Sequence, residues 1–245
     1  MELKRRINLE IWLVLGLSLG KSAVYSVLAL LAALTAEKGL GGSSTTINRS
    51  AAAQQWLDFG YQFFGNVFPL VPVALVLFLL GKGAVARLGI SRLKLGKQLL
   101  AGFALAAAIG IPGLGLYLGA RAIGAAAKVV ATDVIEYWWT IPMLLLGAVG
   151  ASLLEEVIMV GYFFTRLREL GMNEHRIIWL SAIIRGTYHL YQGFGGFVGN
   201  LAMGLIFGYI YKPTGKLIPL LFAHFLLDAA IFVGYAWASG WLALN

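Results

Sequence analysis

A series of apolar runs, each close to the length that crosses a bilayer, constrains the fold of this chain more than any other feature. A helix needs about 20 mainly apolar residues to span the hydrocarbon core. The runs cover residues 11–35, 61–81, 98–119, 135–160, 177–197, 198–211 and 217–240, and the sixth is short. They predict an all-α, polytopic membrane bundle of about seven to eight transmembrane helices. We expect residues 1–245 to form a single integral membrane domain.

The composition supports a membrane protein. Of the 245 residues, 60% are apolar and 12% are charged, whereas an average soluble domain carries about 25% charged residues. The same balance excludes a disordered chain or a coiled coil, and the scattered basic residues do not form a nucleic-acid-binding stripe. The chain has no cysteine, which excludes disulfides and thiolate chemistry. Membrane lipids are therefore expected partners, and nucleic acid is not.

The basic residues predict the orientation. They outnumber acidic residues by 19 to 11, and cytoplasmic loops of membrane proteins are enriched in Lys and Arg. Four basic clusters, at residues 4–6, 82–97, 166–176 and 212–216, can all be placed on one side of the predicted bundle, so the N terminus is expected in the cytoplasm. A polar connection over residues 36–56 is expected to be a surface loop. Lys21 and Arg185 stand apart, because both lie inside apolar runs.

Ionisable residues inside apolar runs indicate where the functional site lies, because such residues are costly in a bilayer. Glu155 and Glu156 are adjacent and stand 11 and 10 residues before Arg166, where the fourth run becomes basic. Eleven residues of helix rise about 16 Å, so both carboxylates should be buried. Two neighbouring buried carboxylates repel each other unless a cation or a metal lies nearby.

Two later runs carry histidines at comparable depth. Arg185, His189 and Gln192 have i, i+4, i+7 spacing, and with Tyr188 they predict a polar helix face that points into the bundle. His224 and Asp228 are one helical turn apart, so the carboxylate can accept the ring N–H and fix the tautomer.

A carboxylate with two imidazoles, shielded from water, is suited to hydrolysis. The carboxylate can act as general base on a water, while the imidazoles hold that water, stabilise an oxyanion or bind Zn²⁺. No G-x-S-x-G motif offers a competing nucleophile. From the residues alone, the prediction is a buried hydrolytic or ion-binding site.

The motifs in residues 135–240 resemble those of the CAAX prenyl endopeptidase and bacteriocin-processing (CPBP, or Abi) intramembrane proteases. Glu155-Glu156 matches E-E-x-x-x-R, His189 matches the end of F-x-x-x-H, and His224 with Asp228 matches H-x-x-x-N/D. The family arginine would fall at Val160, and Arg185 stands where the family has phenylalanine. We expect Arg185 to replace the missing cation by pairing with Glu156.

The resemblance implies an intramembrane endopeptidase that cleaves a membrane-associated protein or peptide, as a metalloprotease or a glutamate protease. Glu155 would activate the water with Glu156 as its partner, and His189, His224 and Asp228 would complete the catalytic set. Glu155, His189 and His224 would be the possible metal ligands, with Zn²⁺ as the cofactor unless the mechanism is metal-free. Arg185, Tyr188 and Gln192 would support them. The relatives imply a bacterial plasma membrane, with the site open to the cytoplasm.

Two other functions fit the same residues. A catalytically silent member would act as a membrane scaffold or chaperone for a partner membrane protein. A proton-coupled carrier would use the acidic residues as a relay, but carriers usually consist of two related halves and the sequence shows no internal repeat.

Overall fold

The computed structural model describes the backbone of residues 2–239 and the side chains of residues 2–234. Most of this chain is helical, as the apolar runs predict. The helical elements are α1 (Glu2–Leu17), α2 (Leu19–Thr35), α3 (Gln55–Val67), η1 (Phe68–Leu70), α4 (Val71–Leu80), α5 (Ala84–Arg87), α6 (Leu95–Ala122), α7 (Thr140–Glu155), η2 (Glu156–Tyr162), α8 (Phe163–Glu169), α9 (Glu174–Thr187), η3 (Leu190–Gln192), α10 (Phe194–Thr214) and α11 (Ile218–Ser239).

An all-α membrane bundle is confirmed by the length and apolarity of these helices. Within the described residues, four continuous helical segments are long and apolar enough to cross a bilayer: Gln55–Leu80, Leu95–Ala122, Thr140–Glu169 and Phe194–Thr214. The pair α1 and α2, bent by 52°, gives a fifth when it is counted as one span. The total of seven to eight transmembrane helices stays a prediction.

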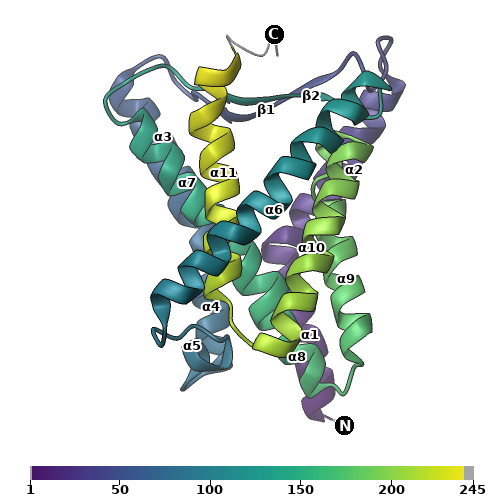
Figure 1. Cartoon of the computed structure of the whole chain (residues 1–245), viewed down its shortest axis with the longest axis vertical. Helices are drawn as coiled ribbons and strands as arrows, with labels where there is room; N and C mark the ends of the chain where they lie inside the picture. Colours follow the sequence, from purple (N-terminus) through teal and green to yellow (C-terminus); the bar gives the residue numbers. More distant parts are fainter. Residues whose placement is uncertain (1, 240–245) are drawn as a thin grey trace.

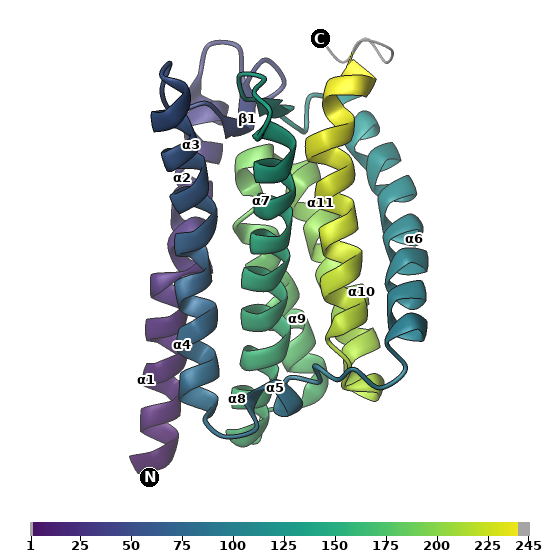
Figure 2. The ribbon, with the colours of Figure 1, turned by 90° about the vertical axis from the view of Figure 1, so that its left-hand side faces the viewer.

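The helix formed by α7, η2 and α8 lies at the centre of the bundle. Half of its most apolar window is buried inside the protein, a larger share than in the other three continuous spans. Helix α11 packs between α7 and α6, and α9 and α10 form an antiparallel hairpin beside them (Figures 1 and 2). The functional residues of the fourth, fifth and last apolar runs therefore come from neighbouring helices.

The two ends of the bundle differ in charge and structure. The start of α1, the segment with α5, helix α8 and the end of α10 lie together at one end (Figures 1 and 2). These segments carry the four predicted basic clusters, which are thus gathered on one side. The opposite end bears a two-stranded parallel sheet of β1 (Ser44–Arg49) and β2 (Lys128–Asp133).

The sheet adds a strand that the prediction of a surface loop over residues 36–56 does not contain. Strand β1 lies within that segment and pairs in register with β2, from Ser44 opposite Lys128 to Arg49 opposite Asp133. The Asn48 side chain adds a hydrogen bond of 2.8 Å to the Ala131 carbonyl oxygen. Paired residues of the two strands are 84 positions apart in the sequence, so local sequence pattern does not reveal their pairing.

The predicted continuous helix over residues 177–197 is wrong, because α9 ends at Thr187 and the chain turns back through η3 into α10. Gly193 allows this turn, since its φ is +92° and a Cβ there would lie 2.8 Å from Ala126 Cα. An antiparallel bridge joins Gly193 to Ala126 and fixes the tip of the hairpin against the segment before β2. Helix α9, with 14 residues, is therefore shorter than a full span, whereas α10 is long enough for one.

A buried arginine joins three helices at the basic end. The Arg166 side chain is 10% exposed and donates hydrogen bonds to Glu10 of α1, Glu169 of α8 and the Leu79 carbonyl oxygen of α4. Tyr162 donates a further bond of 2.9 Å to Glu10. Arg166 thus ties the N-terminal helices to the central one.

We expect Arg166→Met to lower the free energy of unfolding by about 3–5 kcal/mol, because it leaves the Glu10 carboxylate buried without its cation. Thermal unfolding of the purified protein in detergent measures the loss. The matched control is Arg176→Met, which removes an exposed arginine and should leave stability within about 0.5 kcal/mol of wild type. Equal stability of the two variants would contradict the role given to Arg166.

Candidate active site

The two adjacent glutamates lie where the central helix changes its winding. Glu155 is the last residue of α7, and Glu156 begins the π-helical segment η2. Wider π turns interrupt α-helices mostly at functional sites. The side chain of Glu156 is fully buried, whereas that of Glu155 retains 12% of its exposure. The two carboxylates therefore have different surroundings, although they are neighbours in sequence.

Arg185 reaches across from α9 to both glutamates. Its Nη2 donates a hydrogen bond of 2.6 Å to Glu156 Oε1, and its Nη1 lies 3.6 Å from Glu155 Oε2. The guanidinium is 1% exposed, so this ion pair lies inside the protein. The predicted pairing of Arg185 with Glu156 is confirmed. Arg185 on α9 thus supplies the positive charge that the buried, uncharged side chain of Val160 does not provide.

The last described helix contributes a second partner for Glu156. His224 Nδ1 lies 2.7 Å from Glu156 Oε1, and His224 Nε2 lies 3.4 Å from Asp228 Oδ2 one turn further along α11. Both nitrogens of the ring thus face carboxylates, and both contacts are favourable when each nitrogen carries hydrogen. Asp228 is more open, with 20% of its side chain exposed.

Tyr188 belongs to the same cluster, and His189 lies beside it. The Tyr188 hydroxyl donates a hydrogen bond of 2.7 Å to Glu155 Oε2. The His189 ring lies 4.8 Å from the Tyr188 ring, and its Nδ1 is 3.0 Å from the Arg185 carbonyl oxygen. Because a carbonyl only accepts, Nδ1 carries the hydrogen and the Nε2 lone pair is free in the neutral ring.

The structure does not bring every predicted residue into one cluster. Among the described residues, potential ligand atoms of Glu155, Glu156 and His224 lie within 4.8 Å of one another, and His189 is outside this group. Gln192 lies in η3, beyond the end of α9, and donates to the Tyr191 hydroxyl instead. The i, i+4, i+7 face predicted from Arg185 to Gln192 is broken because α9 ends at Thr187.

The chemistry of the cluster fits a metal ion in part. Two carboxylates and an imidazole are ligands that Zn²⁺ accepts, and Glu156 Oε2 is buried without a hydrogen-bond partner among the described residues. The carboxylates of Glu155, Glu156 and Asp228 outnumber the guanidinium of Arg185, so a further positive charge, carried by His224 or by a metal ion, is favourable in the cluster. His224 would have to release a ring proton to become a ligand.

Sequence reasoning missed the residues that make room for Arg185. The Phe207 ring of α10 lies 5.5 Å from the centre of the guanidinium, and Gly204 packs against α9. A Cβ at Gly204 would lie 2.9 Å from Ala182 Cα and 3.3 Å from Arg185 Cδ. These roles depend on the pairing of α9 with α10, which is not evident from either helix alone.

Comparison with known proteins gives one family match. Residues 137–230 match the family model described as Rce1-like, type II CAAX prenyl endopeptidase Rce1-like. This segment contains Glu155, Glu156, Arg185, His189 and His224. No curated protein and no solved structure matches the chain.

We expect Gly204→Ala to destabilise the protein by about 1–3 kcal/mol, because the new methyl group forces α9 and α10 apart at Arg185. The matched control is Gly199→Ala on the same helix, where the Cβ would meet Leu116 Cδ2 at an ordinary 3.6 Å. Both variants gain the same helix propensity, so their difference in thermal unfolding isolates the steric effect. The prediction is wrong if Gly204→Ala is as stable as Gly199→Ala.

Proposed function

We propose, from the match of residues 137–230 to the Rce1-like family model, that this chain is a member of the CPBP family and an intramembrane endopeptidase with a glutamate-activated water. The family supports a CAAX-type endopeptidase in general. The observation that carries the proposal for this chain is the Arg185 bridge to Glu155 and Glu156, which supplies the cation missing at Val160. The site therefore keeps its charge balance despite its departure from the family motif.

Glu155 is the group suited to activate the water. Part of its side chain is exposed, and Tyr188 and Arg185 hold Oε2 in place. Glu155 would take a proton from water while the oxygen adds to the substrate carbonyl carbon, and would then pass that proton to the leaving nitrogen. Glu156 has no exposed surface and its Oε1 already faces Arg185 and His224. Glu156 is therefore a positioning residue.

The two histidines have different parts in this mechanism. His189 has a free Nε2 lone pair that can accept a hydrogen bond from the attacking water. In the metal-free form, His224 with hydrogen on both nitrogens brings positive character to the carboxylates and can stabilise the developing oxyanion. In the metal-bound form it would release one ring proton and act as a ligand instead. Asp228 orients the His224 ring. Tyr188 and Arg185 support Glu155. Gln192 donates a hydrogen bond to the Tyr191 hydroxyl and in this way supports the turn that carries His189.

Zn²⁺ is the proposed cofactor, held by Glu155, Glu156 and His224. The earlier set of Glu155, His189 and His224 is replaced here because His189 is outside the cluster of ligand atoms. When bound, the ion would polarise the water and the substrate carbonyl. The side chains would keep the roles given above: Glu155 would transfer the proton, and Glu156 and Asp228 would position the groups around it.

The substrate would reach the site within the membrane. The basic elements lie at one end of the bundle (Figure 1), which supports a cytoplasmic N terminus by the positive-inside rule. We propose a bacterial plasma membrane, a site open toward the cytoplasm, and a membrane-associated protein or peptide as substrate.

We expect Glu155→Gln to reduce peptide cleavage by at least about 100-fold, in the range by which a positioned general base accelerates a reaction. A quenched-fluorescence peptide with a farnesylated cysteine three residues before its C terminus reports cleavage, since this is the C-a-a-X pattern. Glu37→Gln, an exposed glutamate after α2, is the matched control and should retain activity. Unchanged cleavage by folded Glu155→Gln would favour the scaffold function.

We expect the purified protein to bind close to one Zn²⁺ per chain, measured by elemental analysis after equilibration and washing. His224→Ala and Glu155→Gln should each lower the bound zinc, because each removes a ligand, while Glu37→Gln should not. His189→Ala should retain the zinc. Loss of zinc in His189→Ala alone would instead assign the ligand role to His189, and an absence of zinc from wild type would favour the metal-free mechanism.

A further inference from the structure

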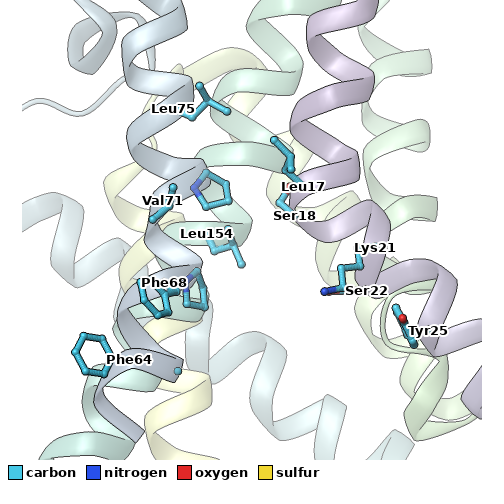
Figure 3. A pocket seen from close by; sticks show the side chains of 13 residues that line it. Leu17, Ser18, Lys21, Ser22, Tyr25, Phe64, Phe68, Val71, Leu75 and Leu154 are labelled. Atoms are coloured by element: carbon cyan, nitrogen blue, oxygen red, sulfur yellow. The ribbon is translucent and has the colours of Figure 1, made fainter. Parts of the chain in front are cut away.

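A pocket of about 710 Å³ lies next to the helix that carries Glu155, and all of its lining residues except Leu154 are outside the segment that matches the family. It lies between the helix break at Ser18, which separates α1 from α2, and the 3-10 turn η1, which joins α3 to α4 within one continuous segment. Leu154 of α7 also lines the pocket and directly precedes Glu155 (Figure 3). The pocket thus connects the N-terminal helices with the catalytic helix.

The pocket walls are mainly apolar, with one cation. Lys21 is the only charged side chain among the residues that line the pocket in the described part of the chain. No described carboxylate lies within 4.0 Å of its ammonium group, which instead lies 6.0 Å from the centre of the Tyr25 ring. Ser18 and Ser22 add hydroxyl groups nearby (Figure 3). These features fit an apolar ligand with one negative group.

The depth of Lys21 distinguishes among anions. Lys21 is 19 residues after the start of the bent α1–α2 pair and 14 residues before its end, so it lies near the middle of this span. Lipid phosphates lie at the surface of a hydrocarbon core that is about 30 Å thick. A lysine at mid-depth is costly unless it has a partner. The anion must therefore be carried into the bilayer by an apolar chain, as the terminal carboxylate of an apolar peptide is.

Helix α2 also connects Lys21 with the catalytic groups. Ser26, five residues after Lys21, donates a hydrogen bond of 2.6 Å to the Tyr188 carbonyl oxygen. The Tyr188 hydroxyl in turn holds Glu155. Five residues of helix rise about 7.5 Å, and an extended peptide covers about 3.3–3.6 Å per residue. Because Leu154 lines the pocket together with Lys21 and Glu155 follows Leu154 directly, we infer that a C-terminal segment of a few residues extends from Lys21 toward Glu155.

We propose that Lys21 binds the C-terminal carboxylate of the substrate, and that the apolar pocket around it holds the last residues of the peptide. This inference rests on the proposed endopeptidase function. Lys21 is thus a specificity-determining residue that selects peptides whose chain ends a few residues beyond the scissile bond.

The test compares two peptides that differ only at the C terminus. Both carry a farnesylated cysteine followed by three aliphatic residues, and one ends in a free carboxylate while the other ends in a carboxamide. Binding is measured by fluorescence anisotropy on full-length Glu155→Gln protein in detergent, so that cleavage does not interfere. Cleavage of both peptides by the wild-type enzyme is measured separately, with kcat and KM resolved.

We expect the free acid to bind about 10- to 100-fold more tightly than the amide, in line with one charge-assisted contact. Lys21→Met, added to Glu155→Gln, should erase this difference by weakening the acid alone, and should raise KM for the acid with little change in kcat. Lys21→Arg should retain the preference for the acid. Lys38→Met, an exposed lysine beyond the end of α2, is the matched control and should also retain it.

Equal binding of acid and amide would overturn the proposal. That comparison needs no change at Lys21, so it remains decisive if Lys21→Met fails to fold. The proposal would also be overturned if Lys21→Met weakened the binding of both peptides equally. Lys21-dependent binding of oleate, without any preference between the two peptides, would overturn it as well and would assign the pocket to a lipid carboxylate. An acid preference without wild-type cleavage would support the pocket assignment while contradicting the endopeptidase function.

Discussion

The buried carboxylate of Glu156 is the constraint on which the rest of the site depends. A charged carboxylate without exposed surface is strongly unfavourable unless donors surround it. Here the donors come from two other helices, Arg185 on α9 and His224 on α11. Because both bonds converge on one oxygen, the three helices must keep a fixed depth relative to one another. The same interaction that offsets the cost of burial therefore aligns the site.

This constraint separates the roles of two neighbouring glutamates. The Arg185 guanidinium binds Glu156 more closely than Glu155: Nη2 lies 2.6 Å from Glu156 Oε1, and Nη1 lies 3.6 Å from Glu155 Oε2. Glu155 keeps partial exposure and a hydrogen bond from Tyr188, so it can reach a water without losing its support. A guanidinium can serve both acids because its donors form a planar fork. Arg185 thus supplies one cation to both acids in a chain whose residue 160 is a valine.

The sequence predicts the membrane bundle and the membership of Glu155, Glu156, Arg185 and His224 in one cluster, because long apolar helices and buried charges have strong local signals. It does not predict the end of α9 at Thr187, since the turn depends on the contact of Gly193 with Ala126 from a distant segment. The β1–β2 pairing is missed for the same reason. His189 was expected on a helix with Arg185, and its place in a turn follows from that early end.

The N-terminal helices explain why the family segment is insufficient to describe this protein. Residues 137–230 contain the proposed catalytic groups, but Ser26 of α2 holds the Tyr188 backbone and Glu10 of α1 pairs with Arg166. The break at Ser18 bends the α1–α2 pair by 52°, and Pro69 and Pro72 remove backbone donors at the 3-10 turn η1, which faces it within the continuous segment Gln55–Leu80. An apolar space lined by both elements lies beside Leu154. The first helices therefore support the proposed catalytic groups and form most of the pocket wall next to the helix that carries Glu155.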